Sequence, residues 1–182
     1  MWREVVSGFE AEKLVFLDET GAWLDMPRLY ARCVGGQRVY DSAARRRKGK
    51  LSLLAAVTSQ GVNPEACMIH EGSVDTQAFL SYLEHVLLPT LKPGQVVIMD
   101  NFTIHHNREV RKLIESAGCR LLYLPTYSPD FNPIELLFSK LKAFVRKLRP
   151  KTLADLFDVL AQAVLHLDPE DARNAFRYCG YQ

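Results

Sequence analysis

The sequence predicts a mixed α/β domain in which a five-stranded sheet carries helices on both faces. Two patterns lead to this class. Short continuous apolar runs such as "QVVIM" are typical of strands covered on both sides. Longer stretches repeat their apolar residues at helical spacing, and the two patterns alternate in the second half of the chain. The length of 182 residues suits one domain with a full core, so we expect a single domain over 1–182.

The first half of the chain predicts three strands. The run "KLVFLDET" at 13–20 is too short for a helix and ends in two acidic residues. The run "KLSLLAAVTSQG" at 50–61 is predicted to be a strand closed by a turn, and "EACMIHEG" at 65–72 its hairpin partner. Between these strands, 35–50 combines Gly35 and Gly36 with six basic residues, which predicts a surface loop.

The rest of the chain predicts five helices and the last two strands. Apolar residues recur at helical spacing from Asp75 to Pro89, and again from about Asn107 to Gly118. The continuous apolar runs at 93–101 and 119–125 predict buried strands. Asn132 is predicted to cap a helix that starts at Pro133, where the missing N–H of proline costs nothing. Further helices are expected at 152–166 and 169–178.

Composition excludes several classes of protein. No apolar run approaches the roughly 20 residues of a membrane span, and the sequence begins without the apolar core of a signal peptide, so we expect a cytoplasmic location. The four cysteines form no C-x-x-C pair, which favours buried structural thiols over zinc or disulfides. Net charge is only +2, but 136–154 holds six basic residues and no acid. Such a basic block either binds a polyanion such as nucleic acid or is simply a surface exposed to solvent.

Three carboxylates form the candidate site. Asp18 and Asp100 are each expected to end a buried strand, and sites in open α/β sheets gather outside such ends. Glu135 falls in the first turn of a helix that follows the proline-rich "YLPTYSPDFNP". Three carboxylates that face one point repel each other unless a cation neutralises them, and hard oxygen ligands favour Mg²⁺ or Mn²⁺. Two such ions about 4 Å apart can activate water or a 3′-hydroxyl for attack on a phosphodiester.

The three acidic motifs resemble a known family. "LDET", "IMDN" followed by His105, and "YSPDFNPIE" are similar to the catalytic blocks of DDE transposases of the mariner superfamily, in its bacterial insertion-sequence branch. The 34 residues between Asp100 and Glu135 match that branch, and the resemblance extends from about Leu14 to Tyr181.

The resemblance implies a ribonuclease H-like fold and cut-and-paste movement of DNA at TA dinucleotides. It implies Asp18, Asp100 and Glu135 as catalytic ligands of two Mg²⁺ or Mn²⁺ ions, with Asp18 bridging both, and a homodimer as the active form. Family members carry helix-turn-helix domains ahead of the first acid, whereas only 17 residues precede Asp18 here. We therefore expect DNA recognition to come from another reading frame, or the copy to be truncated.

Other polar residues have weaker roles in this interpretation. Asn101 and His105 are expected to orient a carboxylate or water, although a histidine at a helix entry is often structural. Lys142 and Arg146 share the helix side of Glu135 and suit a DNA backbone, unless they form a solvated face. The further DNA-contact candidates are Lys140, Arg45, Arg46, Arg47 and Lys48.

Two other functions stay open at this point. A DNA-binding or regulatory remnant could keep the fold without catalysis, although the intact acidic triad argues against it. A phosphatase of the haloacid dehalogenase type also uses a strand-end aspartate, but it requires Asp-x-Asp and position 20 is Thr20.

Overall fold

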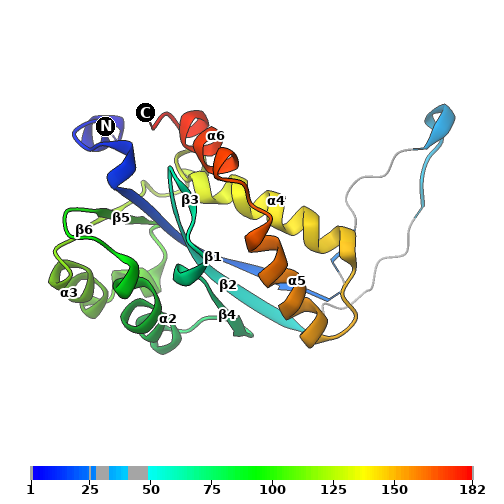
Figure 1. Cartoon of the computed structure of the whole chain (residues 1–182), viewed down its shortest axis with the longest axis horizontal. Helices are drawn as coiled ribbons and strands as arrows, with labels where there is room; N and C mark the ends of the chain where they lie inside the picture. Colours follow the sequence, from blue (N-terminus) through cyan, green and yellow to red (C-terminus); the bar gives the residue numbers. More distant parts are fainter. Residues whose placement is uncertain (1, 25, 28–32, 41–48, 182) are drawn as a thin grey trace.

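The structure is a computed structural model of the chain and describes residues 2–24, 26–27, 33–40 and 49–181. A mixed sheet lies between two groups of helices (Figure 1). Its order is β3-β2-β1-β5-β6, and β4 also pairs with β2. The strands are β1 (Leu14–Trp23), β2 (Lys50–Thr58), β3 (Gly61–Val62), β4 (Met68–Glu71), β5 (Val96–Met99) and β6 (Arg120–Tyr123). β1 is antiparallel to β2 and parallel to β5, which is parallel to β6.

The described sheet has six strands, so the predicted number of five is wrong. The return from β2 is split into β3 and β4, which pair with opposite ends of β2. The 3-10 helix η3 (Pro64–Ala66) separates them. Pro64 has no N–H to donate to a ladder, and the Asn63 side chain accepts from the Glu65 N–H instead, which starts this helical turn.

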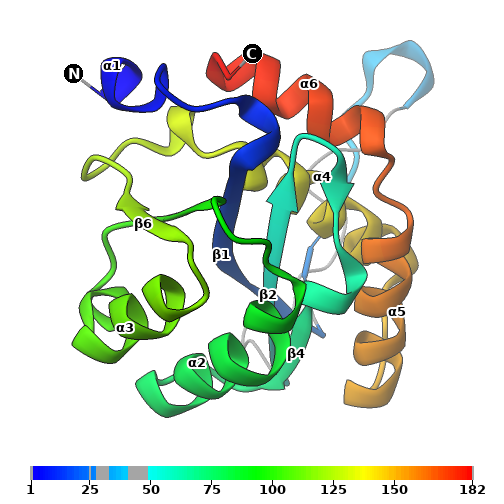
Figure 2. The same ribbon diagram turned by 60° about the vertical axis from the view of Figure 1, so that its left-hand side comes forward.

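The helices cover both faces of the sheet, as predicted. One face carries α2 (Thr76–Tyr82), its continuation η4 (Leu83–Leu87) and η5 (Leu88–Thr90), and α3 (Arg108–Ser116). The other carries α4 (Pro133–Leu148), α5 (Leu153–Leu165) and α6 (Pro169–Cys179), and Figure 2 shows the two groups on opposite sides. The short helix α1 (Trp2–Val6) lies beside the end of α6 in both views. The remaining 3-10 turns are η1 (Ala11–Lys13), η2 (Val34–Gly36), η6 (Thr103–His106) and η7 (Pro129–Phe131).

Alternation along β1 divides the core between the two faces. Phe16 belongs to the cluster under α4, α5 and α6, whereas Val15 and Leu17 belong to the cluster under α2 and α3. The neighbouring β5 alternates in the same way, with Ile98 on the first side and Met99 on the second. Both strands are therefore buried on both faces, which explains their continuous apolar sequences.

Three predictions about the rest of the chain can be compared with the structure. α4 begins at Pro133 and α5 at Leu153, as the sequence predicted, and the structure adds a capping box between Thr152 and Asp155 at the start of α5. Of the expected surface loop at 35–50, residues 41–48 lie outside the described residues, and so do the DNA-contact candidates Arg45, Arg46, Arg47 and Lys48. Within the described ranges, no helix combines the length and the apolarity needed to cross a membrane.

Candidate active site

The register between β1 and β5 brings Asp18 and Asp100 to the same point. The last parallel pair joins Leu17 to Met99, so the two aspartates are the next residues of both strands. Asp18 shares its strand face with Phe16 and therefore looks toward α4. The prediction that Asp18 ends its strand is wrong, because β1 continues to pair with β2 as far as Trp23. Only the pairing of β1 with β5 ends just before Asp18, at Leu17.

Glu135 reaches this point from the first turn of α4. η7 and Pro133 lead directly into the helix, and Asn132 is its first flanking residue. Asp18, Asp100 and Glu135 line one pocket of about 360 Å³, together with Asn101, Phe102, Asn132 and the segment 124–129. The three acids differ in exposure: Asp18 is buried, Asp100 is half-buried and Glu135 is exposed. Three separate segments of the chain therefore contribute one carboxylate each.

Asp18 is held by two hydrogen bonds in a buried position. The Glu19 N–H donates to Oδ1 at 2.7 Å, and Asn132 Nδ2 donates to Oδ2 at 2.8 Å. Burial raises the pKa of Asp18 from 3.8 to about 7, and the Glu19 N–H only partly offsets this. The charges of Asp100 and Glu135 raise this pKa further, whereas that of His105 lowers it. The Asp18 carboxylate thus lies where negative charge is costly and a cation is favoured.

Asp100 lies in the opposite environment. Its Oδ1 accepts from His105 Nδ1 at 2.7 Å and from the Phe102 N–H at 3.1 Å. Burial alone raises the pKa of Asp100, but the bond to His105, the charge of that ring and the Phe102 N–H together bring it below 3.8. Asp100 is therefore ionised at neutral pH.

His105 is a buried residue that fixes Asp100. Its ring is 1% exposed and packs on Phe79 with 4.7 Å between ring centroids. The Tyr123 hydroxyl donates to its backbone carbonyl at 2.7 Å. Nδ1 of His105 donates to the Asp100 carboxylate, and Nε2 has no hydrogen-bond partner among the described residues.

Asn101 lines the pocket, but its side chain contacts other groups. Its Nδ2 donates to Thr126 Oγ1 at 3.0 Å, and its Oδ1 contacts His106 Nε2. His106 in turn stacks on Tyr123. Asn101 therefore ties the end of β5 to the segment 124–129 in this structure.

Asn132 is a residue of the site that sequence reasoning did not find. It was predicted to cap α4 with its side chain, and among the described residues that side chain makes no capping bond. It donates to Asp18 instead, is 3% exposed, and its Oδ1 has no partner in the described part of the chain. Its place directly before Pro133 and Glu135 was the only signal in the sequence.

The donor set suits a hard divalent cation. Among the described residues, no three histidine, cysteine, aspartate or glutamate side chains form a group already arranged to hold a metal ion. The oxygens of Asp18 and Asp100 are turned toward Asn132 and His105. Three carboxylates nevertheless line one pocket, and the unpartnered Oδ1 of Asn132 adds a buried acceptor there. To coordinate an ion, the carboxylates of Asp18 and Asp100 would have to rotate toward the pocket.

The basic candidates lie on two sides of α4. Lys142 and Arg146 follow Glu135 by seven and eleven residues, so they share its side of the helix, and both are half-buried. Lys140 lies on another side, where its Nζ contacts Asp171 of α6 at 2.6 Å. Lys140 thus ties two helices together.

Comparisons with known proteins agree with this geometry. The family model of the DDE superfamily endonucleases matches residues 13–156, which include all three carboxylates. No curated protein matches the sequence significantly.

Among solved structures, the chain is similar to a pre-cleavage Mos1 transpososome, with a TM-score of 0.77, 18% identity, and coverage of 97% of this chain and 54% of that chain. The Mos1 mariner paired end complex with Mn gives a TM-score of 0.76, 18% identity, and coverage of 97% and 54%. The Mos1 catalytic domain with Raltegravir and Mg gives 0.66, 19% identity, and coverage of 97% and 81%. The chain thus spans about half the length of the first two, and these likenesses confirm the expected ribonuclease H-like fold.

Proposed function

The chain belongs to the DDE superfamily endonucleases, and we propose that it is the catalytic domain of a transposase that cleaves DNA strands and joins them to new sites. Cut-and-paste movement of a bacterial insertion sequence of the mariner superfamily is the process we assign to it. The observation that carries the proposal is the pocket in which Asp18, Asp100 and Glu135 meet from three different segments.

In this proposal, Asp18, Asp100 and Glu135 hold Mg²⁺ or Mn²⁺, with two ions in the loaded site. When bound, such ions activate water or a 3′-hydroxyl and stabilise the leaving oxygen of a phosphodiester. Solved structures with Mn and Mg among the similar proteins support divalent metal use. His105 holds Asp100 ionised and in one orientation through the 2.7 Å bond. Asn132 holds one oxygen of Asp18, which leaves the carboxylate fewer orientations.

DNA is the substrate and principal partner in this proposal. Similar solved structures are described as a transpososome and as a paired end complex, which supports DNA ends as substrates for this chain as well. We assign phosphate contacts to Lys142 and Arg146, and also to Arg45, Arg46, Arg47 and Lys48. The sequence candidate Lys140 is left out, because its Nζ contacts Asp171. The active form is a homodimer that acts on TA targets in the bacterial cytoplasm and nucleoid.

The test is metal-dependent DNA cleavage by the wild type and by matched acid variants. Asp18→Asn and Glu135→Gln preserve size and remove one ligand charge each, so we expect cleavage with Mg²⁺ or Mn²⁺ to fall about a hundredfold or more. Glu115→Gln is the control, because Glu115 lies on α3 and pairs with Arg111. It should cleave like the wild type.

Three results decide between the functions. Equal cleavage by the wild type and both acid variants would show that the nuclease activity does not come from this pocket. Binding of DNA by the wild type without any cleavage in either metal would favour the regulatory remnant. Loss of cleavage confined to the pocket variants supports the proposal.

A further inference from the structure

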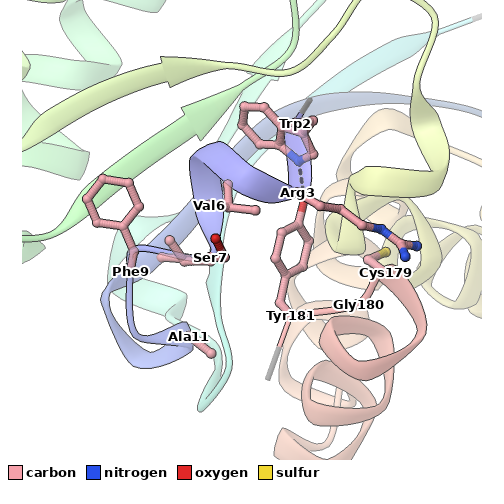
Figure 3. A pocket seen from close by; sticks show the side chains of 10 residues that line it. Trp2, Arg3, Val6, Ser7, Phe9, Ala11, Cys179, Gly180 and Tyr181 are labelled. Carbon is pink, nitrogen blue, oxygen red and sulfur yellow. Dashed lines mark hydrogen bonds between the residues drawn. The ribbon is translucent and has the colours of Figure 1, made fainter.

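Tyr181 connects two distant parts of the chain through its hydroxyl. Trp2 Nε1 donates to this hydroxyl at 2.9 Å, and the hydroxyl donates to the carbonyl of Phe131 at 2.6 Å. Figure 3 shows the Trp2 ring above Tyr181, at the edge of a pocket of about 310 Å³ between α1 and the end of α6. Burial raises the pKa of Tyr181 to about 12 despite the Trp2 N–H, so the hydroxyl keeps its proton for donation at neutral pH.

The ring of Tyr181 is fixed independently of its hydroxyl. Tyr181 is 6% exposed, and its ring lies 4.9 Å from that of Phe16 and 5.9 Å from that of Phe176, measured between centroids. Phe16 precedes Asp18 by two residues on the same face of β1. Because these ring contacts do not involve the oxygen, removing the oxygen alone leaves the packing in place.

The carbonyl that Tyr181 binds lies at the entrance to α4. Phe131 ends η7 and directly precedes Asn132, whose side chain donates to Asp18 at 2.8 Å. α1 also reaches Phe131 through Arg3, whose guanidinium lies 5.9 Å from the centre of the Phe131 ring. Within η7, the hydrogen bonds from Phe131 N to Ser128 and from Asn132 N to Pro129 are local. The contacts that fix this turn against the rest of the molecule therefore include those of Tyr181 and Arg3.

We propose that Tyr181 is a positioning residue of the candidate active site: through the Phe131 carbonyl it holds Asn132 against Asp18, and Trp2 holds its hydroxyl in place. The connection runs from α1 through Tyr181, Phe131 and Asn132 to Asp18. Its residues are separated by 179, 50 and 114 positions, so it exists only in the folded chain. The catalytic consequence rests on the proposed function, whereas the positioning of Asn132 does not.

The test compares Tyr181→Phe with Tyr178→Phe. Tyr178 lies on α6 and is 73% exposed, so its hydroxyl serves as a matched control. We expect amide exchange of residues 131–136 in metal-free Tyr181→Phe to accelerate about five- to tenfold, the effect of losing one buried hydrogen bond. Exchange in β2 and α3 should stay at the wild-type rate. Trp2→Phe removes only the first bond of the connection and should give a smaller acceleration at the same amides.

Metal affinity and kinetics then measure the consequence for the site. We expect Mn²⁺ affinity, measured by titration calorimetry, to fall severalfold in Tyr181→Phe, and kcat for DNA cleavage to fall while KM for DNA stays unchanged. Uniformly faster exchange across the whole domain, or unchanged exchange at 131–136, would overturn the inference, because Tyr181 would then stabilise only the fold or nothing local. Unchanged Mn²⁺ affinity and kcat despite local opening would also overturn it.

Failure of the proposed function gives a different result. In that case the wild type neither cleaves DNA nor binds Mn²⁺, and the exchange rates at 131–136 alone decide whether Tyr181 positions Asn132. Faster local exchange in Tyr181→Phe then supports the positioning role, and equal rates in Tyr181→Phe and Tyr178→Phe reject it.

Discussion

At the scale of single residues, the two aspartates of the pocket follow the same parallel ladder and meet opposite surroundings. Asp18 is buried beside two other carboxylates, and its pKa rises to about 7. Asp100 accepts from His105 and Phe102, which outweigh its burial, and its pKa falls. At neutral pH the pocket therefore combines one ionised aspartate with one that is close to half-protonated. A cation that binds there displaces the proton of Asp18.

The raised pKa of Asp18 predicts an unusual dependence of stability on pH. Between pH 4 and pH 7 the folded, metal-free protein keeps a proton on Asp18 that the unfolded chain has released, so the free energy of unfolding falls as pH rises. Integrated over that window, the loss amounts to up to roughly 4 kcal/mol. Asparagine does not titrate in this range, so the free energy of unfolding of Asp18→Asn does not fall in this way as pH rises. Urea unfolding in EDTA should show the variant more stable than the wild type at pH 8, with the difference shrinking toward pH 4.

Asp155→Asn provides a comparison of opposite sign. The pKa of Asp155 is lowered by hydrogen bonds from the Thr152 and Lys151 N–H groups, so its contribution is present above its usual pKa and is lost as pH falls. This variant should be less stable than the wild type at pH 8. Parallel stability curves for the wild type and Asp18→Asn between pH 4 and pH 8 would contradict the assignment of a raised pKa to Asp18.

The sequence placed the acids better than it placed their partners. Apolar runs that end near Asp18 and Asp100 predicted that the two aspartates could be neighbours, with Glu135 alongside in the first turn of α4, and all three acids line one pocket. The hydrogen bond from Asn132 to Asp18 was not predictable, because an asparagine just before Pro133 is already explained locally as a helix cap. Only the three-dimensional distance shows that the side chain turns to β1.

At the scale of elements, α4 presents three different sides. One side carries the buried stripe of Ile134, Leu137, Phe138, Leu141 and Val145. A second carries Glu135, Lys142 and Arg146, and a third carries Lys140 in its contact with Asp171. This arrangement separates residues that the sequence grouped into one basic block.

The separation predicts different effects for two neighbouring lysines. If Lys142 and Arg146 contact the DNA backbone, Lys142→Ala weakens binding of every sequence about equally and lowers the log–log salt slope by about 0.9 for the lost duplex phosphate contact. Lys140→Ala removes the same charge from the α6 side and should leave the slope closer to that of the wild type, since its Nζ is engaged by Asp171. Binding titrations at several salt concentrations measure both slopes. Equal slopes for Lys142→Ala and the wild type would mean that the row is a solvated face.

Periodicity predicted the existence of most elements, and local pairing decided their ends. The start of α4 at Pro133 was predicted, because a proline in the first turn of a helix is a local signal, although the Asn132 side chain bonds Asp18 instead of capping the helix. The continuation of β1 past Asp18 was missed, since residues 20–23 lose the apolar run but still pair with β2. The division between β3 and β4 was missed because β4 pairs with a distant part of β2, from Leu51 with Glu71 to Leu54 with Met68, and a short sequence window does not show such pairs.

At the scale of the whole molecule, the candidate site exists only when distant segments come together. Asp18 comes from β1, Asp100 from the end of β5 and Glu135 from α4. The connection from Trp2 to Phe131 adds α1 and Tyr181, which follows α6. The unfolded chain has no such constellation. Any ion that binds the pocket therefore binds the folded state selectively and stabilises the whole domain.

This selectivity predicts a thermal shift that identifies the ligands without DNA. With Mn²⁺ at a hundredfold excess over its Kd, the wild type gains about 2.7 kcal/mol, which for a domain of this size raises Tm by roughly 5–10 °C. At one fixed Mn²⁺ concentration, the rise in Tm should be larger at pH 8 than at pH 6. At pH 6 the ion must displace the proton that Asp18, with a pKa of about 7, still holds. Asp18→Asn and Glu135→Gln should lose most of the shift, whereas Glu115→Gln on α3 should keep it. Scanning calorimetry of the four proteins in EDTA and in Mn²⁺ measures this directly. If Mn²⁺ raises the Tm of Asp18→Asn as much as that of the wild type, the ion binds outside this pocket, because the substitution removes the Asp18 carboxylate that is proposed to hold it.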